Sequence, residues 1–297
     1  MSAPDTGRVP SDVGGVDARR HSAGQEGAEG AEAGSAGVER IAAAFAKPGR
    51  RAALMPYLMG GFPDLDRSRA IGEAYADGGA DLVELGVPYS DPLADGPVIQ
   101  AAGTRALRAG ATLDGVLGVC AALAPRLPVV LMVYANVVYA RGVAAFCAAL
   151  RDAGASGLIV PDLPMEEAPL VLEACDAAGL ALVPLVAPTS PDERMRRIGA
   201  RARGFLYTVS VTGITGERAA LEDAYGLIVA RAKAHTEVPV ALGFGISTPD
   251  QARAAADAGA DGVIVGSRLV RAAAEHADDP AAAVRGLVAG LAAGLDA

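Results

Sequence analysis

Short apolar segments alternate with longer alanine-rich segments from Leu54 to the end of the chain. Apolar runs of four to eight residues are typical of buried strands, and the alanine-rich stretches follow the period of a helix. The pattern predicts eight strands near residues 54–59, 81–87, 128–134, 156–160, 180–186, 204–209, 238–243 and 261–265. About eight strand–helix units close a parallel barrel, so we predict a (β/α)8 TIM barrel.

A glycine-led phrase recurs ahead of three of these strands, at Gly79-Ala80-Asp81, Gly154-Ala155-Ser156 and Gly259-Ala260-Asp261. Each phrase fits a helix that ends at glycine and leads into a buried strand. A doubly wound open sheet has the same local pattern. The strand count and the length of 297 residues favour the barrel.

The segment before the barrel has two parts. Residues 1–37 have almost no large apolar side chain, so we predict a disordered polar tail. Val38–Phe45 has an amphipathic pattern that ends at Pro48-Gly49, which predicts a short helix that caps the lower end of the barrel. The predicted catalytic domain is therefore residues 38–297.

Composition excludes several classes of partner. The formal net charge is -9, which argues against nucleic acid or an anionic membrane surface as the main partner. No apolar run is long enough to cross a bilayer, and the first residues lack a basic region followed by an apolar stretch, so we expect a cytoplasmic protein. Cys120, Cys147 and Cys175 are widely separated, so neither a zinc site nor a disulfide framework is predicted, and reduced core thiols are expected.

The second predicted strand carries a carboxyl group between two apolar residues. Glu84 lies between Val83 and Leu85, and the loop that follows is stiff and acidic as far as Asp95. An ionised carboxylate is costly in a low-dielectric site unless it is paired or used, so catalysis is the favoured reading. The alternatives are that Glu84 reaches solvent or pairs with an arginine, and that Asp95 is an ordinary turn residue.

The last two strands end in motifs that suit a phosphate group. Gly245 and Ser247 follow the seventh strand, and Gly266 and Ser267 follow the eighth. Backbone N–H groups at glycines and helix N-termini bind anions, and the last two strands of such barrels are the usual place. The alternative is that the glycines only make tight turns and the serines only cap helices.

The supply of catalytic side chains narrows the chemistry. Schiff-base aldol chemistry needs a pocket lysine, and metal-assisted aldol chemistry normally needs imidazole ligands. No lysine or histidine is placed at a predicted C-terminal strand end; those present are Lys47, Lys233, His21, His235 and His276. The remaining chemistry is proton transfer by carboxylic acids on a phosphorylated substrate.

At these residues the chain resembles the tryptophan synthase alpha chain family from about Val38 onward. The resemblance rests on the segments Glu84–Pro97, Tyr134-Ala135-Asn136, Pro161-Asp162-Leu163-Pro164, Gly213-Ile214-Thr215-Gly216 and Gly243-Phe244-Gly245-Ile246-Ser247. It implies a lyase of L-tryptophan biosynthesis that cleaves indole-3-glycerol phosphate, by a retro-aldol step, to indole and glyceraldehyde 3-phosphate.

The resemblance also implies residue roles. Glu84 protonates C3 of the indole ring and removes the glycerol hydroxyl proton, and Asp95 holds the indole N–H. Tyr207 and Thr215 support the pocket and a closing loop from Ser210 to Arg218. The expected phosphate contacts are Gly216, Gly245, Gly266 and Ser267, and the expected indole slot is Tyr57, Ile99, Met132 and Phe244.

Apolar residues on the loops at the catalytic rim predict a docking face, namely Tyr89, Pro92, Leu93, Tyr139 and Pro164. The resemblance implies that a beta chain docks there in an α2β2 assembly, with pyridoxal phosphate in the beta chain and no cofactor or metal in this one. Asp91, Asn136 and Asp162 are then interface residues, although an ordinary loop-turn role fits them equally well.

Three other functions stay open at this point. One is a different phosphate-binding barrel enzyme, such as a sugar-phosphate isomerase or indoleglycerol-phosphate synthase, although the synthase uses pocket lysines that this chain lacks. Another is a regulatory subunit without catalysis, which has no need of both Glu84 and Asp95. The third is a stand-alone lyase that releases free indole.

Overall fold

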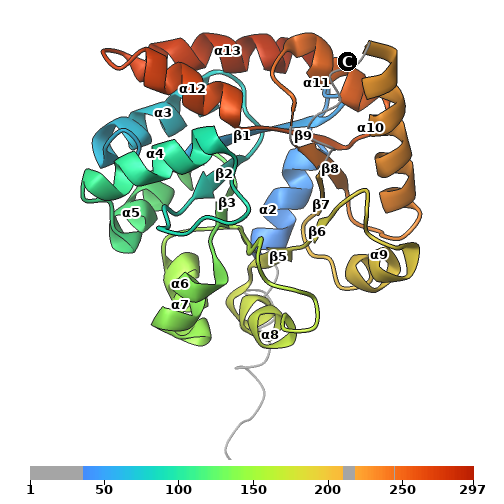
Figure 1. Ribbon diagram of the computed structural model, residues 1–297, viewed down its shortest axis with the longest axis horizontal. Coiled ribbons are helices and arrows are strands. Elements are labelled where there is room, and N and C mark those ends of the chain that lie inside the picture. The colour runs from blue at the N-terminus through green and yellow to red at the C-terminus, as the bar shows by residue number, and fades with distance from the viewer. Residues whose placement is uncertain (1–35, 210–217, 244) are drawn as a thin grey trace, which may run out of the picture.

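The computed structural model describes residues 36–209, 218–243 and 245–297, and within them the strands form one parallel sheet. The neighbours run in the order β5-β4-β3-β2-β1-β9-β8-β7-β6 (Figure 1). The strands are β1 (Ala53–Met59), β2 (Val83–Gly86), β3 (Val129–Met132), β4 (Gly157–Ile159), β5 (Ala181–Val183), β6 (Leu185–Val186), β7 (Leu206–Val209), β8 (Val240–Gly243) and β9 (Gly262–Val265).

The sheet closes on itself because its two end strands follow each other in the chain. β5 pairs with β4, and β6 pairs with β7. Pro184 separates β5 from β6 and has no N–H to donate, while its carbonyl oxygen accepts from the Tyr207 N–H at 3.0 Å. The predicted strand 180–186 is therefore two short strands, and the predicted TIM barrel is confirmed.

Helices surround the barrel, as Figure 1 shows. Side-chain caps start several of them: the side chains of Asp64, Thr112 and Asp279 accept from backbone N–H groups in the first turn. The outer helices are α3 (Leu65–Asp77), α4 (Pro97–Arg108), α5 (Leu113–Leu123), α6 (Ala135–Arg141), α7 (Val143–Asp152), α8 (Pro169–Ala178), α9 (Asp192–Gly199), α10 (Arg218–Lys233), α11 (Pro249–Asp257), α12 (Ser267–Glu275) and α13 (Pro280–Gly294).

Helix α2 (Ala36–Phe45) closes the lower end of the barrel. Ile41 is fully buried in the interior cluster of the barrel, and the rings of Phe45 and Phe205 lie 5.5 Å apart. This confirms the predicted capping helix, although it begins at Ala36 rather than Val38. The first turn of the helix is held to the segment between α8 and β5, since the Gly37 N–H donates to the Gly179 carbonyl oxygen at 3.0 Å. The predicted tail lies, up to residue 35, outside the described residues.

The recurring glycine-led phrase has a structural purpose at the lower end of the barrel. Asp81 Oδ2 accepts from the Leu54 N–H, and Asp261 Oδ2 accepts from the Val240 N–H, both at 2.8 Å. Lys47 and Lys233 each lie 2.7 Å from the second oxygen of these carboxylates. Both lysines of the chain are thus engaged in ion pairs at strand starts, far along each strand from the C-terminal rim.

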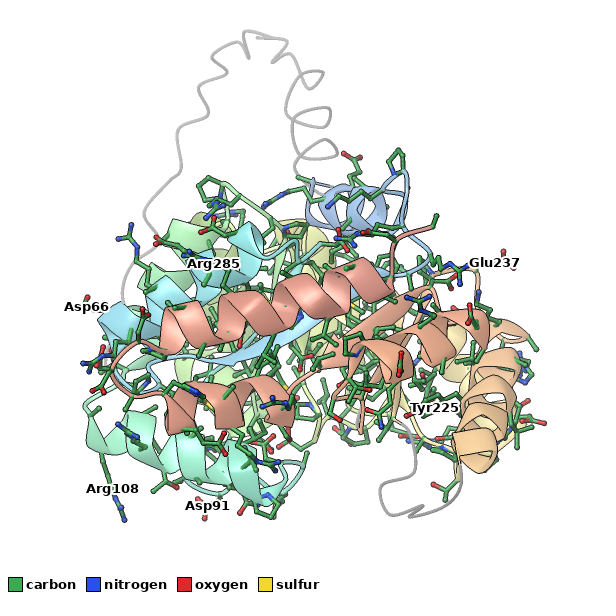
Figure 2. All side chains as sticks on the ribbon, turned by 90° about the horizontal axis from the view of Figure 1, so that it is seen from above. Asp66, Asp91, Arg108, Tyr225, Glu237 and Arg285 are labelled. Atoms are coloured by element: carbon green, nitrogen blue, oxygen red, sulfur yellow. The ribbon has the colours of Figure 1, made fainter. Side chains whose placement is uncertain are left out.

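The two ends of the barrel differ in what they carry. Figure 2 shows α2 at one end and Asp91, on the loop after β2, at the edge of the opposite end. Active sites of TIM barrels lie at the end where strands terminate, which here is the end of the Asp91 loop.

Across the described residues, no single helix is both long enough and apolar enough to cross a membrane. The bent pair α4–α5 meets these two criteria only when its helices are taken together.

Candidate active site

Glu84 lies on β2 with its side chain inside the barrel. It is in register with Tyr57 on β1 and Val130 on β3, and Val130 belongs to the interior cluster. The residue is only 4% exposed, and Glu84 Oε2 has no hydrogen-bond partner among the described residues. Burial, and then the nearby charge of Asp95, raises the pKa of the Glu84 carboxyl to about 8. A carboxyl in this setting keeps its proton at neutral pH.

Asp95 lies near Glu84 at the end of the loop that joins β2 to α4. The loop is folded back on itself, since the Asp95 N–H donates to the Pro92 carbonyl oxygen at 3.1 Å. Gln100 on α4 donates to the Asp95 carbonyl oxygen at 2.9 Å. Burial raises the pKa of the half-buried Asp95 side chain to about 6. A hydrogen bond from the Tyr134 hydroxyl lowers this pKa and so opposes part of the effect of burial. Asp95 is therefore the more acidic member of the pair.

Tyr134 is a site residue to which the sequence analysis gave no role. Its hydroxyl accepts from the Ala94 N–H at 3.0 Å, and its ring stacks on Tyr89 with centroids 5.1 Å apart. It thereby holds the loop that carries Asp95. The available signal was its place two residues after the end of β3, at the same end of the barrel as that loop.

Two buried tyrosines complete the interior around the acids. Burial raises the pKa of both Tyr57 and Tyr207. The nearby carboxylates of Glu84 and Asp95 raise it further. Each ring occupies space left by a glycine on the neighbouring strand. A Cβ on Gly86 would meet Tyr57 Cζ at 2.6 Å, and a Cβ on Gly243 would meet Tyr207 Cζ at 2.8 Å. The glycines of both motifs are therefore needed to admit these rings.

The two predicted phosphate motifs differ in their hydrogen bonding. Helix α11 starts after Thr248, not at Ser247 as expected, because Thr248 and Gln251 form a capping box. Gln251 also accepts from the Ser247 N–H at 2.8 Å, so that donor is engaged. Helix α12 begins at Ser267 after Gly266, and no side chain caps it. Within the described residues, the start of α12 is thus the open N–H cluster at this end of β8 and β9.

The other predicted pocket residues have mixed positions. Tyr57 and Ile99 are buried, and Met132 is half-buried at the end of β3, where it packs against both the interior and the outer clusters. Gly245 follows β8 with a left-handed backbone at φ 86°, which glycine adopts readily. Thr215, Gly216 and Phe244, together with the predicted closing loop up to residue 217, lie outside the described residues.

The predicted docking residues lie on loops at the same rim. Leu93 is 88% exposed and Tyr139 is 45% exposed. Asp91, Asn136, Asp162 and Pro164 are also exposed, whereas Tyr89 and Pro92 are half-buried. Asp162 has a local structural contact, because its Oδ1 accepts from the Ala135 N–H at the start of α6 at 2.9 Å.

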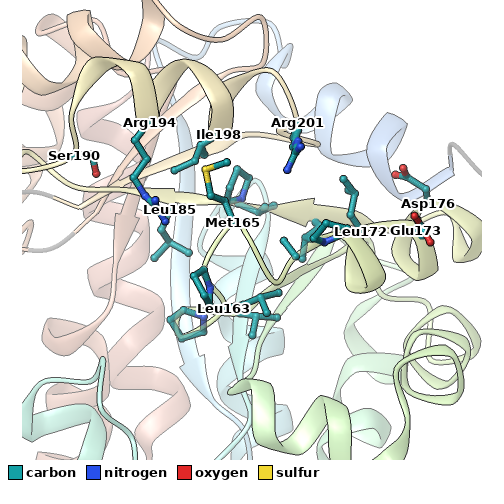
Figure 3. Close-up of a pocket in the computed structure, with 18 residues that line it drawn as sticks. Leu163, Met165, Leu172, Glu173, Asp176, Leu185, Ser190, Arg194, Ile198 and Arg201 are labelled. Carbon is teal, nitrogen blue, oxygen red and sulfur yellow. The ribbon is translucent and has the colours of Figure 1, made fainter.

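A separate cavity of about 430 Å³ lies between the β4–α8 loop, β6 and α9. Figure 3 shows Met165 and Leu172 within it, with Arg194 and Arg201 entering from the α9 side. Neither Glu84 nor Asp95 lines this cavity. Within the described residues, no group of three or more His, Cys, Asp or Glu side chains is arranged to hold a metal ion.

Comparisons with known sequences agree on one family. The tryptophan synthase alpha chain family matches residues 43–293. The tryptophan synthase alpha chain of Prochlorococcus marinus (strain MIT 9313) is 51% identical over 241 residues, which are 80% of this chain and 85% of that one. The one from Synechococcus sp. (strain CC9902) is 52% identical over 239 residues, with 80% and 89% covered.

Solved structures give the same answer. A chain of Mycobacterium tuberculosis tryptophan synthase superimposes with a TM-score of 0.80 at 39% identity, covering 89% of this chain and 99% of that chain. A chain of the tryptophan synthase a2b2 complex from Pyrococcus furiosus gives a TM-score of 0.76 at 36% identity, covering 82% and 98%.

Proposed function

The chain belongs to the tryptophan synthase alpha chain family, and on that premise we propose that Glu84 and Asp95 carry its reaction. The family's reaction is a lyase step of L-tryptophan biosynthesis, the retro-aldol cleavage of indole-3-glycerol phosphate to indole and glyceraldehyde 3-phosphate. One observation carries the assignment of Glu84. Its carboxyl is buried inside the barrel, Oε2 has no hydrogen-bond partner among the described residues, and its pKa is raised to about 8.

Glu84 acts first as the general acid. The indole ring becomes a leaving group only after C3 is protonated, and a carboxyl that keeps its proton at neutral pH can supply it. The carboxylate that results then accepts the proton of the glycerol hydroxyl as the C–C bond breaks. The proton balance closes on one residue, because Glu84 regains the proton that it gave.

Asp95 acts as the carboxylate that holds the indole N–H. Its pKa of about 6 leaves it ionised at neutral pH, where it stabilises the positive charge that develops on the protonated ring. The hydrogen bond from Tyr134 favours this ionised form. Tyr57, Ile99, Met132 and Phe244 form the slot for the ring, and Tyr207 and Thr215 support it.

The proposed binding site for the phosphate group is the start of α12. Gly266 and Ser267 present backbone N–H groups and the positive end of the helix dipole, and Gly245 and Gly216 complete the cradle. No side chain caps the start of α12, so its N–H groups are available to an anion. A capping box engages the start of α11, which makes α12 the better candidate. No cationic side chain is needed there.

The partner is a tryptophan synthase beta chain, and the assembly is α2β2, as in the Pyrococcus furiosus complex. The exposed rim residues, Leu93 and Tyr139 among them, form the docking face together with Tyr89, Asp91, Pro92, Asn136, Asp162 and Pro164. Pyridoxal phosphate belongs to the beta chain, and this chain carries out its own step without a cofactor. Cytoplasmic location stays a prediction from the sequence.

Incubation of the purified protein with indole-3-glycerol phosphate, with and without a beta chain, tests the proposal. We expect indole from the wild type and more indole with the beta chain. Glu84→Gln should lose about 10²–10⁴-fold in cleavage rate, as expected for removal of an acid–base group. Glu73→Gln, on the outer face of α3, is the matched control and should keep the wild-type rate.

Each alternative gives a different result in the same assay. If the wild-type protein makes no indole with or without a beta chain, the result indicates a different barrel enzyme or a regulatory subunit. Cleavage that the beta chain does not change indicates a stand-alone lyase. A Glu84→Gln variant that folds normally and keeps the wild-type rate contradicts the role of Glu84.

A further inference from the structure

Two of the three cysteines of the chain lie against each other in the outer layer of the barrel. Cys147 on α7 and Cys175 on α8 are 28 residues apart in sequence, and their Sγ atoms are 3.8 Å apart. Their exposed fractions are 1% and 0%, and both belong to the hydrophobic cluster that contains Phe146 and Val171. Cys120 on α5 is also buried but has no thiol neighbour within the described residues.

The contact makes the two thiols chemically unequal. A thiol–thiol hydrogen bond lowers the pKa of Cys147 and raises the pKa of Cys175. The pKa of Cys147 is thus the lower of the two, and the thiolate is the form of a cysteine that reacts with oxidants. Burial raises the pKa of the isolated Cys120 thiol to about 12, so this third cysteine is unreactive by the same criterion.

We propose that Cys147 and Cys175 are an oxidisable pair that closes to a disulfide between α7 and α8 when the protein meets a peroxide. A disulfide needs an S–S distance of about 2.05 Å, so the two sulfurs must approach by about 1.8 Å from the reduced separation. The two side chains are on neighbouring packed helices. Rotation about their Cα–Cβ bonds moves the sulfur atoms and can close this gap.

The reaction balances with hydrogen peroxide as the oxidant. The Cys147 thiolate attacks one peroxide oxygen, the O–O bond breaks, and Cys147 becomes a sulfenic acid with release of water after proton uptake. The Cys175 sulfur then attacks the Cys147 sulfur, the S–O bond breaks, and a second water leaves. Two thiols are oxidised, one peroxide is reduced to two waters, and a dithiol reductant reverses the change.

The bond would connect the supports of two rim loops. Helix α7 follows the segment that carries Asn136 and Tyr139, and α8 follows the β4 loop that carries Asp162 and Pro164. The ring closed by the disulfide contains β4 and that loop. Oxidation therefore fixes the spacing of α7 and α8, the helices next to the loops of the proposed docking face. The cysteine pair is thus a modification site separate from the proposed catalytic residues, Glu84 and Asp95.

Counting free thiols in the folded, full-length protein tests the proposal. The reduced chain is treated with one equivalent of hydrogen peroxide and any unreacted peroxide is removed. The protein is then unfolded in N-ethylmaleimide, and its mass is measured by mass spectrometry. Of the three cysteines, we expect only Cys120 to be labelled, with a cross-linked peptide that joins Cys147 to Cys175. Dithiothreitol should restore labelling of all three.

Two variants separate the pair from general thiol oxidation. Cys120→Ala should lose all labelling after peroxide, because the pair remains intact. Cys175→Ala should keep both of its remaining thiols, since Cys147 has lost the hydrogen bond that favours its thiolate. Three results would each overturn the proposal. They are full labelling of the peroxide-treated wild type, loss of labelling at Cys120 together with the other two, and loss of labelling at Cys147 in Cys175→Ala at the wild-type rate.

Discussion

At the scale of single residues, burial of the Glu84 carboxyl makes the stability of the protein depend on pH. Its folded-state pKa of about 8 exceeds the ordinary value of 4.5, so the folded chain binds more protons between these pH values. The free energy of unfolding therefore falls as pH rises from about 4.5 to about 8 and then levels off with respect to this group.

Glu84→Gln removes this dependence, because an amide cannot ionise. We expect the free energy of unfolding of the variant to exceed that of the wild type at pH 8.5 by on the order of 2–4 kcal/mol, and to match it near pH 4.5. Urea unfolding at the two pH values measures the difference, with Glu73→Gln as the control. The same difference at both pH values would contradict a raised pKa at Glu84.

The proposed roles of the two acids also predict the pH range of catalysis. The proposed mechanism needs Glu84 protonated and Asp95 ionised, so kcat/KM for cleavage should rise with an apparent pKa of about 6 and fall with one of about 8. Because the carboxyls interact, these values belong to the pair. Steady-state rates from pH 5 to 9.5 measure the profile. Full activity at pH 9.5 would show that Glu84 does not act as the acid.

Tyr134 tunes one limb of that profile. Tyr134→Phe removes the hydrogen bond that lowers the pKa of Asp95 and the one that holds the Ala94 N–H, so the acid limb should move to higher pH. We expect a loss in kcat/KM below pH 7 and a smaller loss at pH 7.5. Tyr139→Phe on the exposed face of α6 is the control, and an unmoved acid limb in Tyr134→Phe would contradict its role as a positioning residue.

Sequence reasoning finds some of these residues and misses others for a physical reason. Glu84 stands out because a carboxyl within an apolar strand is costly by itself. Tyr134 does not, because its importance comes from a contact with Ala94, 40 residues away in the chain. The engaged Ser247 N–H was equally hidden, since it depends on which way the Gln251 side chain turns.

At the scale of elements, apolar periodicity is enough to place the strands, because each strand is buried on both sides. It does not show where a strand is interrupted. The run 180–186 reads as one strand by its apolar residues. Pro184 is the sequence sign of a break, and the pairing of β5 with β4 and β6 with β7 shows it. The amphipathic pattern of α2 predicts its position under the barrel, because its apolar side chains need an interior to fill.

The contribution of α2 can be measured with Ile41→Ala. Ile41 is fully buried, and its Cδ1 lies 3.3 Å from the position that a Cβ on Gly157 would take, so truncation leaves a cavity in the barrel floor. We expect a loss of about 2–5 kcal/mol in the free energy of unfolding with cleavage retained at low temperature. Urea unfolding measures the loss, and Ala42→Ser on the exposed side of α2 is the control.

Little change in Ile41→Ala would mean that α2 is not part of the cooperative core. Loss of cleavage at full stability would mean that the helix acts on the active site and not only on the fold.

At the scale of the whole molecule, stability and chemistry occupy opposite ends of the barrel. Ion pairs such as Lys47–Asp81 and Arg50–Asp296 gather at the end closed by α2, where the Arg51 N–H also donates to the Leu295 carbonyl oxygen at 2.8 Å. The opposite end carries the two acids and the exposed apolar loops. This separation leaves the rim loops available for a partner without weakening the lower end.

Leu93 is the sharpest probe of that partner surface, because it is 88% exposed on the loop between Glu84 and Asp95. Leu93→Ser should weaken beta-chain binding by about 1–3 kcal/mol, or roughly 5- to 150-fold in Kd, as expected for an apolar side chain buried in an interface. Isothermal titration with a beta chain measures the change, and indole release by the isolated protein should stay near the wild-type rate.

Leu227→Ser on α10 is the matched control, since Leu227 is 65% exposed away from the rim loops and should bind the beta chain as the wild type does. Equal weakening in both variants would indicate a general loss of solubility or stability. Unchanged binding in Leu93→Ser would remove this loop from the docking face. In that case the exposed leucine would need a different explanation, because an apolar side chain on the loop between the two proposed catalytic acids has no benefit for an enzyme that works alone in water.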